Sequence, residues 1–257
     1  MAKSRKSSKK ILPKLTESNY YDRESDLVYM SVSQYKSFMS CEARAMAKLN
    51  GEYEEEKSTA LLVGSYCDSA IEGTLEQFKA ENPQIFKKNG ELYSDYAKAE
   101  EIVRLIRENE LFQKYLVAGE KQVILTFELF GVWWKIKMDS FDRRKRITDM
   151  KIMRNTESIP KWRYDTQGCV YQKGVELNDL GKLPFYLAVA TKEDIPDLNI
   201  FQIPQSTLDL ALMEVEENLP HIMEVKTGKI APTRCEKCDY CKRTRKTMIR
   251  NYNELLE

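Results

Sequence analysis

The sequence KIKMDSFDRRKRITDMKIM spans residues 135–153 and decides the fold of this chain. Apolar and polar residues alternate on both sides of its basic centre, which is the periodicity of β-strands. With the preceding residues it predicts a hairpin over residues 121–142, broken near Gly131, and a third strand over residues 144–153. Asp149 and Lys151 are two positions apart on that strand, so their side chains face the same side of the sheet.

Helical patterns surround these strands in the sequence. Apolar residues recur at helical spacing over residues 31–50, 58–72 and 95–117, so the N-terminal part is predicted to be helical. Behind the third strand, the patterns indicate a helix, two strands and a last helix, over residues 162–178, 183–192, 197–204 and 206–228. This order predicts an α/β fold with a mixed central β-sheet flanked by helices.

The predicted strands carry a possible hydrolytic site. Asp139 is expected at the end of one strand, and an antiparallel neighbour would bring it beside Asp149 and Lys151. Carboxylate oxygens bind Mg²⁺ or Mn²⁺, and a nearby lysine can orient water or neutralise developing charge. A D-x-K triplet is common in a chain with 32% charged residues, so two ordinary exposed charges are the competing interpretation. Because their neighbours are apolar, the charges would be costly unless paired or metal-bound, which favours the site.

The same residues resemble a known signature. Asp139, Asp149 and Lys151 resemble the D…(D/E)-x-K motif of PD-(D/E)XK nucleases. Downstream, Gln167 and Tyr171 are similar to the Q-x-x-x-Y motif of the RecB-like branch. They are four positions apart on the predicted helix and therefore share one face.

A third motif lies upstream. Residues 64–68, GSYCD, resemble the G-x-x-x-H motif of that branch, with Asp68 in the histidine position. The resemblance covers about residues 30–245 and extends to phage-type proteins related to the RecE exonuclease, exodeoxyribonuclease VIII. It implies a restriction-endonuclease-like core and a Mg²⁺- or Mn²⁺-dependent DNA exonuclease. The metal ligands it implies are Asp68, Asp139 and Asp149, and the catalytic residues it implies are Asp139, Asp149, Lys151, Gln167 and Tyr171.

Cysteines form a second motif. Cys235, Cys238 and Cys241 have C-x2-C-x2-C spacing, which indicates a metal site that lacks one ligand. Cys41 is the candidate fourth ligand, since RecB-like nucleases with a [4Fe–4S] cluster combine one early cysteine with three near the C-terminus. This resemblance implies an iron–sulfur cluster that ties the C-terminal cysteines to an N-terminal helix. The alternatives are a four-thiolate zinc site, free thiols and a C-x-x-C redox function, although no thioredoxin-like βαβ pattern surrounds the motif.

Composition limits the setting of the protein. The net charge of +1 argues against a passive, charge-driven DNA coat, although local basic runs such as residues 143–146 could guide DNA. Residues 1–20 are expected to be a disordered basic arm, and residues 21–257 a single nuclease domain. No apolar run is long enough to cross a bilayer and no secretory signal is recognisable, so a cytoplasmic protein with no membrane contact is expected.

Two functions follow from these patterns. The first is a DNA exonuclease in phage recombination or DNA end-processing, with DNA, a single-strand annealing protein and further copies of itself as possible partners. The alternative is a catalytically inactive protein of the same fold that binds DNA or a partner. The aspartate in the histidine position of the first motif supports this alternative, and metal-dependent cleavage would separate the two.

Overall fold

The computed structural model describes residues 12–55, 58–247, 249 and 251–255. These residues form two compact units. Unit 1 contains the described residues up to Val32 and those between Glu56 and Glu217, and unit 2 contains Ser33–Glu55 and the described residues from Asn218 onward. The single nuclease domain expected over residues 21–257 stays a prediction.

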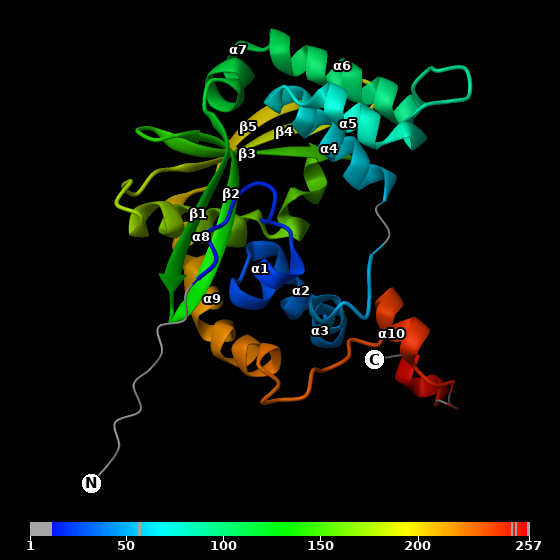
Figure 1. Cartoon of the computed structure of the whole chain (residues 1–257), viewed down its shortest axis with the longest axis vertical. Helices are drawn as coiled ribbons and strands as arrows, with labels where there is room; N and C mark the ends of the chain where they lie inside the picture. The colour runs from blue at the N-terminus through cyan, green and yellow to red at the C-terminus, as the bar shows by residue number, and fades with distance from the viewer. Residues whose placement is uncertain (1–11, 56–57, 248, 250, 256–257) are drawn as a thin grey trace. The chain divides into compact units, whose positions relative to one another are not determined.

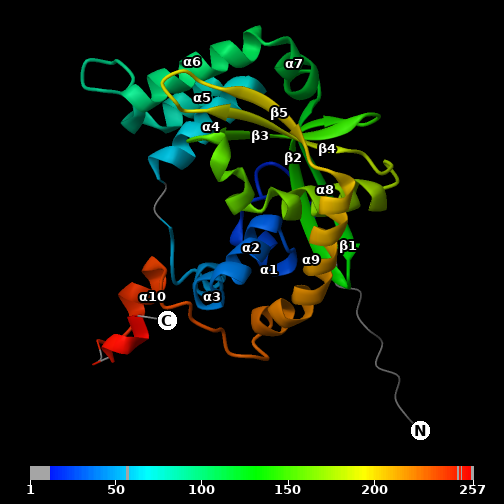
Figure 2. The ribbon, with the colours of Figure 1, turned by 180° about the vertical axis from the view of Figure 1, so that it is seen from behind.

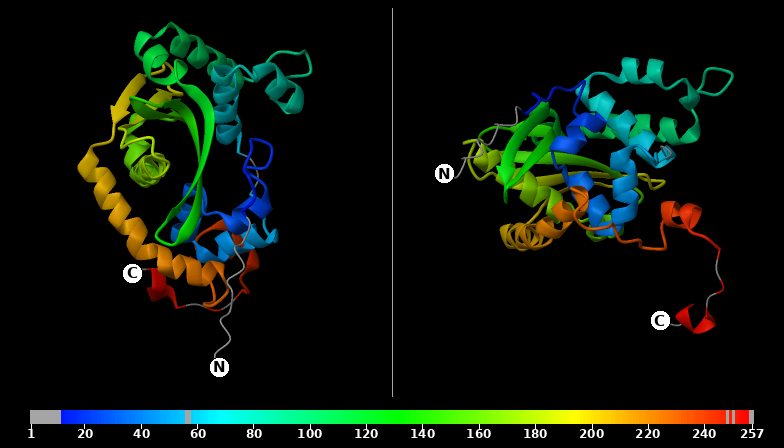
Figure 3. Two further views of the ribbon diagram at one scale, coloured as in Figure 1. Left: turned by 60° about the vertical axis from the view of Figure 1, so that its left-hand side comes forward. Right: turned by 60° about the horizontal axis from the view of Figure 1, so that its bottom comes forward.

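Unit 1 is built on a five-stranded sheet with the order β1-β2-β3-β4-β5. The strands are Glu120–Leu129, Val132–Asp142, Arg146–Met153, Phe185–Thr191 and Leu198–Gln202. Strands β3 and β4 are parallel and the other neighbours are antiparallel, so the predicted mixed sheet is confirmed. Strands β1 and β2 form a long, curved hairpin (Figure 3).

Helices cover both faces of this sheet (Figures 1 and 2). On one face, α4 (Thr59–Glu72), α5 (Leu75–Glu81) and α6 (Ser94–Glu108) pack against Met150, Ala188 and Ala190. On the other face lies α8 (Tyr164–Leu177), which connects β3 to β4 as a parallel crossover requires. Met150 lies between Asp149 and Lys151, and β-strand side chains alternate. The two charged side chains therefore point to the face that α8 covers.

Short elements complete unit 1. They are α1 (Arg23–Val28), η1 (Pro83–Ile85), α7 (Glu110–Phe112), the π-helical turn η2 (Gln113–Val117) and η3 (Thr156–Trp162). The segment before α1 lies on β2, because the buried ammonium of Lys135 donates to the carbonyl of Tyr20 and pairs with Asp26. Part of the expected arm, residues 1–11, lies outside the described residues. Residues 12–20 are described, and Tyr20 is buried.

Unit 2 contains α2 (Val32–Ser40), which begins at the last residue of unit 1, and α3 (Glu42–Asn50). It also contains the C-terminal part of α9 (Gln205–Lys226), α10 (Asp239–Thr244) and η4 (Tyr252–Leu255). Glu42 connects these segments by accepting hydrogen bonds from the Thr233 backbone and hydroxyl, and its other oxygen lies 2.7 Å from the His221 ring. Among the described residues, no helix is both long and apolar enough to span a membrane.

Candidate active site

The site forms where β2 and β3 separate. Their ladder pairs Ser140 with Thr148 and does not continue to the next pair, which would be Asp139 and Asp149. The backbone N–H of Met150 donates instead to Oδ2 of Asp139 at 2.8 Å. The prediction that Asp139 ends its strand is wrong, because β2 continues to Asp142. The ladder between β2 and β3, however, does end beside Asp139, and this brings the two carboxylates together.

Asp149 is held from two sides. It is buried, with an exposed fraction of 2%. Its Oδ1 accepts a hydrogen bond of 2.6 Å from the Gln167 amide on α8, and its Oδ2 forms an ion pair with the Lys151 ammonium. The Lys151 ammonium also lies 5.3 Å from the centre of the Tyr164 ring, within the range of a cation–π interaction. Gln167, Asp149 and Lys151 therefore form one connected polar group.

Three carboxylates share this region. Burial raises the pKa of Asp68, on α4, to about 7; the nearby Lys151 opposes this effect, whereas Glu72 and Asp149 add to it. Burial likewise raises the pKa of Asp139 well above its usual value, with repulsion from Asp149 and Asp68 adding to the effect. Such a set is unfavourable when all its members are ionised without a cation. A hard divalent ion supplies the missing charge and prefers carboxylate oxygens, so the chemistry of these side chains suits Mg²⁺ or Mn²⁺.

Tyr171 takes a supporting position. Its hydroxyl donates to the backbone carbonyl of Lys137 on β2 at 3.0 Å, and its ring packs edge-on against Phe185. Burial raises the pKa of Tyr171 well above its usual value, so the phenol stays protonated at neutral pH. Tyr171 thus contacts the backbone of β2, the core and the Gln167 side chain, whereas Gln167 contacts a carboxylate directly.

Sequence reasoning missed several residues that influence the site. Lys137 is two positions before Asp139 on β2, and Glu72 is one helical turn after Asp68; both affect the pKa of Asp68. Strand and helix periodicity could have found these two. The rings of Tyr20 and Tyr21 both lie within 6 Å of the Lys137 ammonium, at 5.9 Å and 4.8 Å. No sequence signal connects these tyrosines with the site, because they belong to a segment far from it in the chain.

Four cysteines meet within unit 2. The sulfur atoms of Cys41, Cys235, Cys238 and Cys241 all lie within 4.8 Å of one another. Cys41 and Cys241 are 3.6 Å apart, and Cys235 and Cys241 are 4.0 Å apart. Backbone N–H groups donate to Cys235 and Cys238, and those of Lys237 and Cys238 lower the pKa of Cys235 to about 6. The predicted fourth cysteine is therefore in contact range, and the set fits a thiolate-bound metal.

Comparisons with known proteins agree with this fold. A family model described as a PDDEXK-like domain of unknown function (DUF3799) matches residues 31–244. A solved structure named "Putative exonuclease" from Eubacterium rectale is 45% identical, with a TM-score of 0.91, and the match covers 95% of this chain and 98% of that chain. The solved structure of SSO0001 is 14% identical over 75% of this chain and 85% of that one; its TM-score of 0.30 supports no argument. No curated protein matches the sequence.

Proposed function

This chain belongs to the PDDEXK-like family DUF3799, and from that membership and the site we propose that it is a metal-dependent DNA exonuclease. The observation that carries the proposal is the convergence of Asp139, Asp149 and Lys151 where β2 and β3 separate. The buried carboxylate of Asp149 and the partly buried one of Asp139, beside one ammonium, are the groups that phosphodiester hydrolysis uses. The name of the Eubacterium rectale relative supports the exonuclease assignment.

Asp68, Asp139 and Asp149 would hold the metal. A divalent ion bound there polarises the phosphate and lowers the pKa of bound water. The protein's contribution is to fix the ligands: the Met150 N–H orients Asp139, and the Gln167 amide orients Asp149. Each carboxylate keeps one oxygen free of that orienting hydrogen bond. Ligands held in this way do not need to reorganise when substrate binds.

Lys151 would stabilise negative charge and would not act as a base. Although burial lowers it, the pKa of Lys151 is raised overall by Asp149 and Asp139, so the ammonium stays charged at neutral pH. A fixed positive charge beside two carboxylates can bind a non-bridging phosphate oxygen and the charge that develops on it. Gln167 would position Asp149 through its hydrogen bond, and Tyr171 would position the backbone of β2.

The cysteine cluster would hold a separate metal ion. Zinc binds thiolates at about 2.3 Å in a tetrahedron, which separates the sulfurs by about 3.8 Å. The separations of 3.6 Å and 4.0 Å agree with one ion. Thiolates around a four-iron cluster lie farther apart because each binds a different iron. The sulfur positions therefore favour the zinc alternative over the [4Fe–4S] cluster that the family resemblance implied.

The alternative function is DNA or partner binding without cleavage. Asp68 in the histidine position of the first motif is the observation that favours it. A carboxylate is nevertheless an ordinary ligand for Mg²⁺, so this replacement does not itself remove the metal site. A role in phage recombination, a single-strand annealing partner and self-association stay predictions from the family resemblance.

Cleavage of end-labelled linear DNA and of the same DNA as a closed circle tests the proposal. With Mg²⁺ or Mn²⁺, an exonuclease shortens the linear molecule from an end and leaves the circle intact, and EDTA stops the reaction. Cutting of the circle would replace the exonuclease with an endonuclease. Metal-dependent DNA binding without any cleavage would establish the alternative function.

A further inference from the structure

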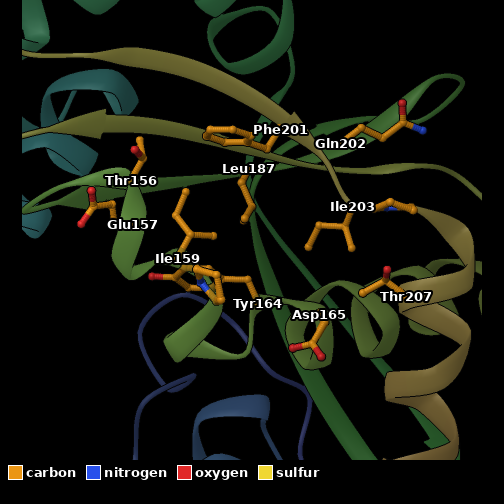
Figure 4. Close-up of a pocket in the computed structure, with 12 residues that line it drawn as sticks. Thr156, Glu157, Ile159, Tyr164, Asp165, Leu187, Phe201, Gln202, Ile203 and Thr207 are labelled. Atoms are coloured by element: carbon orange, nitrogen blue, oxygen red, sulfur yellow. The ribbon is translucent and has the colours of Figure 1, made fainter.

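A pocket of about 580 Å³ lies beside the candidate active site, within unit 1. Figure 4 shows its lining from η3, the start of α8, strand β4, the edge strand β5, and the start of α9. Most of the lining is apolar, and the large side chains are Ile159, Tyr164, Leu187, Phe201 and Ile203. Its volume is within the range of pockets that bind small organic groups, roughly 300–1,000 Å³.

The sheet register connects this pocket to the carboxylates. Asp149 on β3 pairs with Leu187 on β4, and Leu187 pairs with Phe201 on β5. Paired residues on adjacent strands point to the same face of a sheet, and adjacent strands are about 4.8 Å apart. Phe201 thus lies about 10 Å from Asp149 on the same face, with the buried Leu187 between them.

Tyr164 is the second connection. It lines the pocket, and the same ring lies 5.3 Å from the Lys151 ammonium. A phosphate bound at Lys151 would therefore lie next to a ring that also lines the pocket. In a nucleotide the base is separated from its own phosphate by one sugar, and such a span suits the two-strand distance from Asp149 to Phe201.

We propose that this pocket receives the unpaired base of the nucleotide whose phosphate is cut. The inference rests on the proposed nuclease function and specifies its substrate as an unpaired DNA end. Aromatic and aliphatic walls suit the flat face of any base, and stacking on an aromatic side chain is tolerant of sequence. A base still paired in a duplex cannot enter, so the end must first separate from its complement.

Polar groups at the pocket match the edges of a base. Figure 4 shows Asp165 and Thr207 at its border beside Tyr164 and Ile203. The Arg163 side chain donates to Asp165 at 3.1 Å and also pairs with Glu214 at 2.6 Å, so two carboxylates share one guanidinium and hold it beside the pocket. Phe201 is 37% exposed although it is apolar. An apolar ring left partly open beside polar groups is what a base-stacking surface requires.

Direct binding tests this pocket without depending on cleavage. Wild-type protein with Mg²⁺ is titrated with thymidine 5′-monophosphate, thymidine 3′-monophosphate and deoxyribose 5-phosphate. At least one thymidine nucleotide should bind tighter than the sugar phosphate by about 5- to 150-fold, the factor that base stacking supplies. Phe201→Ala should remove most of this preference and Phe201→Tyr should restore it. Equal affinity of all three compounds for wild-type protein would overturn the inference.

Phe130→Ala is the matched control. Phe130 has the same exposed fraction of 37%, but it lies in the turn between β1 and β2. Strand β1 is at the opposite edge of the sheet from β5. Phe130→Ala should keep the wild-type preference, and a loss equal to that of Phe201→Ala would contradict the assignment.

A cleavage assay separates the nuclease proposal from the pocket assignment. If wild-type protein binds the nucleotide with this preference but cuts no DNA, the nuclease proposal fails and the pocket stands only as a site for an unpaired base. If it cuts strands with a normal or an abasic terminal nucleotide equally fast, the pocket assignment fails.

Discussion

At the scale of residues, the ion pair between Lys151 and Asp149 joins the ammonium of the site to its carboxylates. Lys151 is the positive group that lowers the pKa of both Asp68 and Asp139, against the effect of their burial. Removing it takes away the positive charge that acts on both carboxyl groups, so both hold their protons more tightly. The phosphate also loses a positive charge that would stabilise it.

Lys151→Met should therefore reduce cleavage by about 100- to 1,000-fold, a typical effect of losing one stabilising group in an active site. The fold should survive, because the methionine stem occupies a similar space. Initial rates on linear DNA at saturating Mn²⁺ measure the effect. Lys173→Met is the control, since Lys173 forms only a surface pair with Glu176 and lies outside the site. A Lys151→Met protein as active as this control would refute the role of the lysine.

The carboxyl group of Asp68 gives a second prediction, on pH. Burial raises its pKa to about 7 in the metal-free protein, above the ordinary value of 3.8. A raised pKa means that the folded state binds the proton more tightly than the unfolded state, so this group stabilises the fold at low pH. That contribution is lost as pH rises from about 4 through 7.

Melting curves of metal-free protein between pH 5 and pH 8 test this prediction. Wild-type stability should fall more steeply with rising pH than that of Asp68→Asn, which cannot ionise. Added Mg²⁺ should stabilise wild type more at pH 8 than at pH 5, because protons compete with the ion for the carboxylate. Parallel pH profiles for the two proteins would show that Asp68 ionises normally.

Not every charge near the site has this importance. The basic run of residues 143–146 was considered as a segment that could guide DNA, but its members differ. Arg143 pairs with Glu120 at 2.6 Å, and Arg146 is buried, with its guanidinium 4.3 Å from the centre of the Tyr115 ring. Arg146 therefore serves the packing of η2 against the sheet. A run of like charges in a sequence does not tell which members are exposed.

At the scale of elements, α8 positions Gln167 and Tyr171, and close packing fixes the helix on the sheet. A β-carbon at Gly174 would lie 2.3 Å from the ring of Phe127 on β1, and one at Gly168 would lie 2.8 Å from Phe185 and Leu208. The two glycines let α8 approach β1 and β4 closely. This approach puts the Gln167 amide within reach of Asp149.

Gly174→Ala should destabilise the protein by about 1–3 kcal/mol, the usual cost of forcing an extra methyl group into a packed core. Gly64→Ala is the matched control, because Gly64 is also in a helix but has nothing within 4 Å of the added carbon. The control should be neutral or stabilising by up to about 1 kcal/mol. Denaturant unfolding measures both, and equal midpoints would contradict the packing argument.

Much of the sheet was predictable because its strands have clear patterns. The alternation over residues 121–153 predicted β1, β2 and β3, and the runs over 183–204 predicted β4 and β5. The sequence did not predict the role of Lys135, which looks like a solvent-facing residue of a strand. It is buried because the chain before α1 covers it and supplies Asp26 and the carbonyl of Tyr20. Periodicity describes a strand and not what another segment lays over it.

The candidate site, like the sheet, could be predicted only in part. Asp149, Lys151 and Gln167 were predicted from spacing and family resemblance, and the structure brings them into contact. The pocket lined by Tyr164, Leu187 and Phe201 was not predicted. Its walls come from five elements, and each residue alone looks like ordinary core or surface. Such a pocket follows from the order of the strands in the sheet, which local patterns do not specify.

At the scale of the whole molecule, the chain combines a carboxylate site in unit 1 with a thiolate site in unit 2. The two sites would bind different metals, since carboxylates prefer hard ions and thiolates prefer softer ones. A chelator should therefore act in two ways. Loss of Mg²⁺ or Mn²⁺ should stop cleavage reversibly, whereas loss of a thiolate-bound ion should lower stability.

Metal analysis of the purified protein tests the thiolate site. Wild type should contain about one zinc ion per chain and be colourless, as expected for a single tetrahedral ion. Cys238→Ser should lose the ion and melt at a lower temperature. Cys169→Ser should keep it, because Cys169 is a buried cysteine in unit 1. A brown protein containing several iron atoms would support the iron–sulfur cluster instead.

The proposed function requires that the carboxylates where β2 and β3 separate hold the metal for DNA hydrolysis. The most direct test is the initial rate of degradation of end-labelled linear DNA with Mn²⁺, for wild type, Asp149→Asn and Asp194→Asn. Asparagine keeps the shape of the side chain but removes the charge that binds a metal, whereas Asp194 lies in the loop between β4 and β5. We predict a loss of at least about 1,000-fold for Asp149→Asn and wild-type rates for Asp194→Asn. Equal rates for all three proteins would contradict the claim and move the chemistry away from this site.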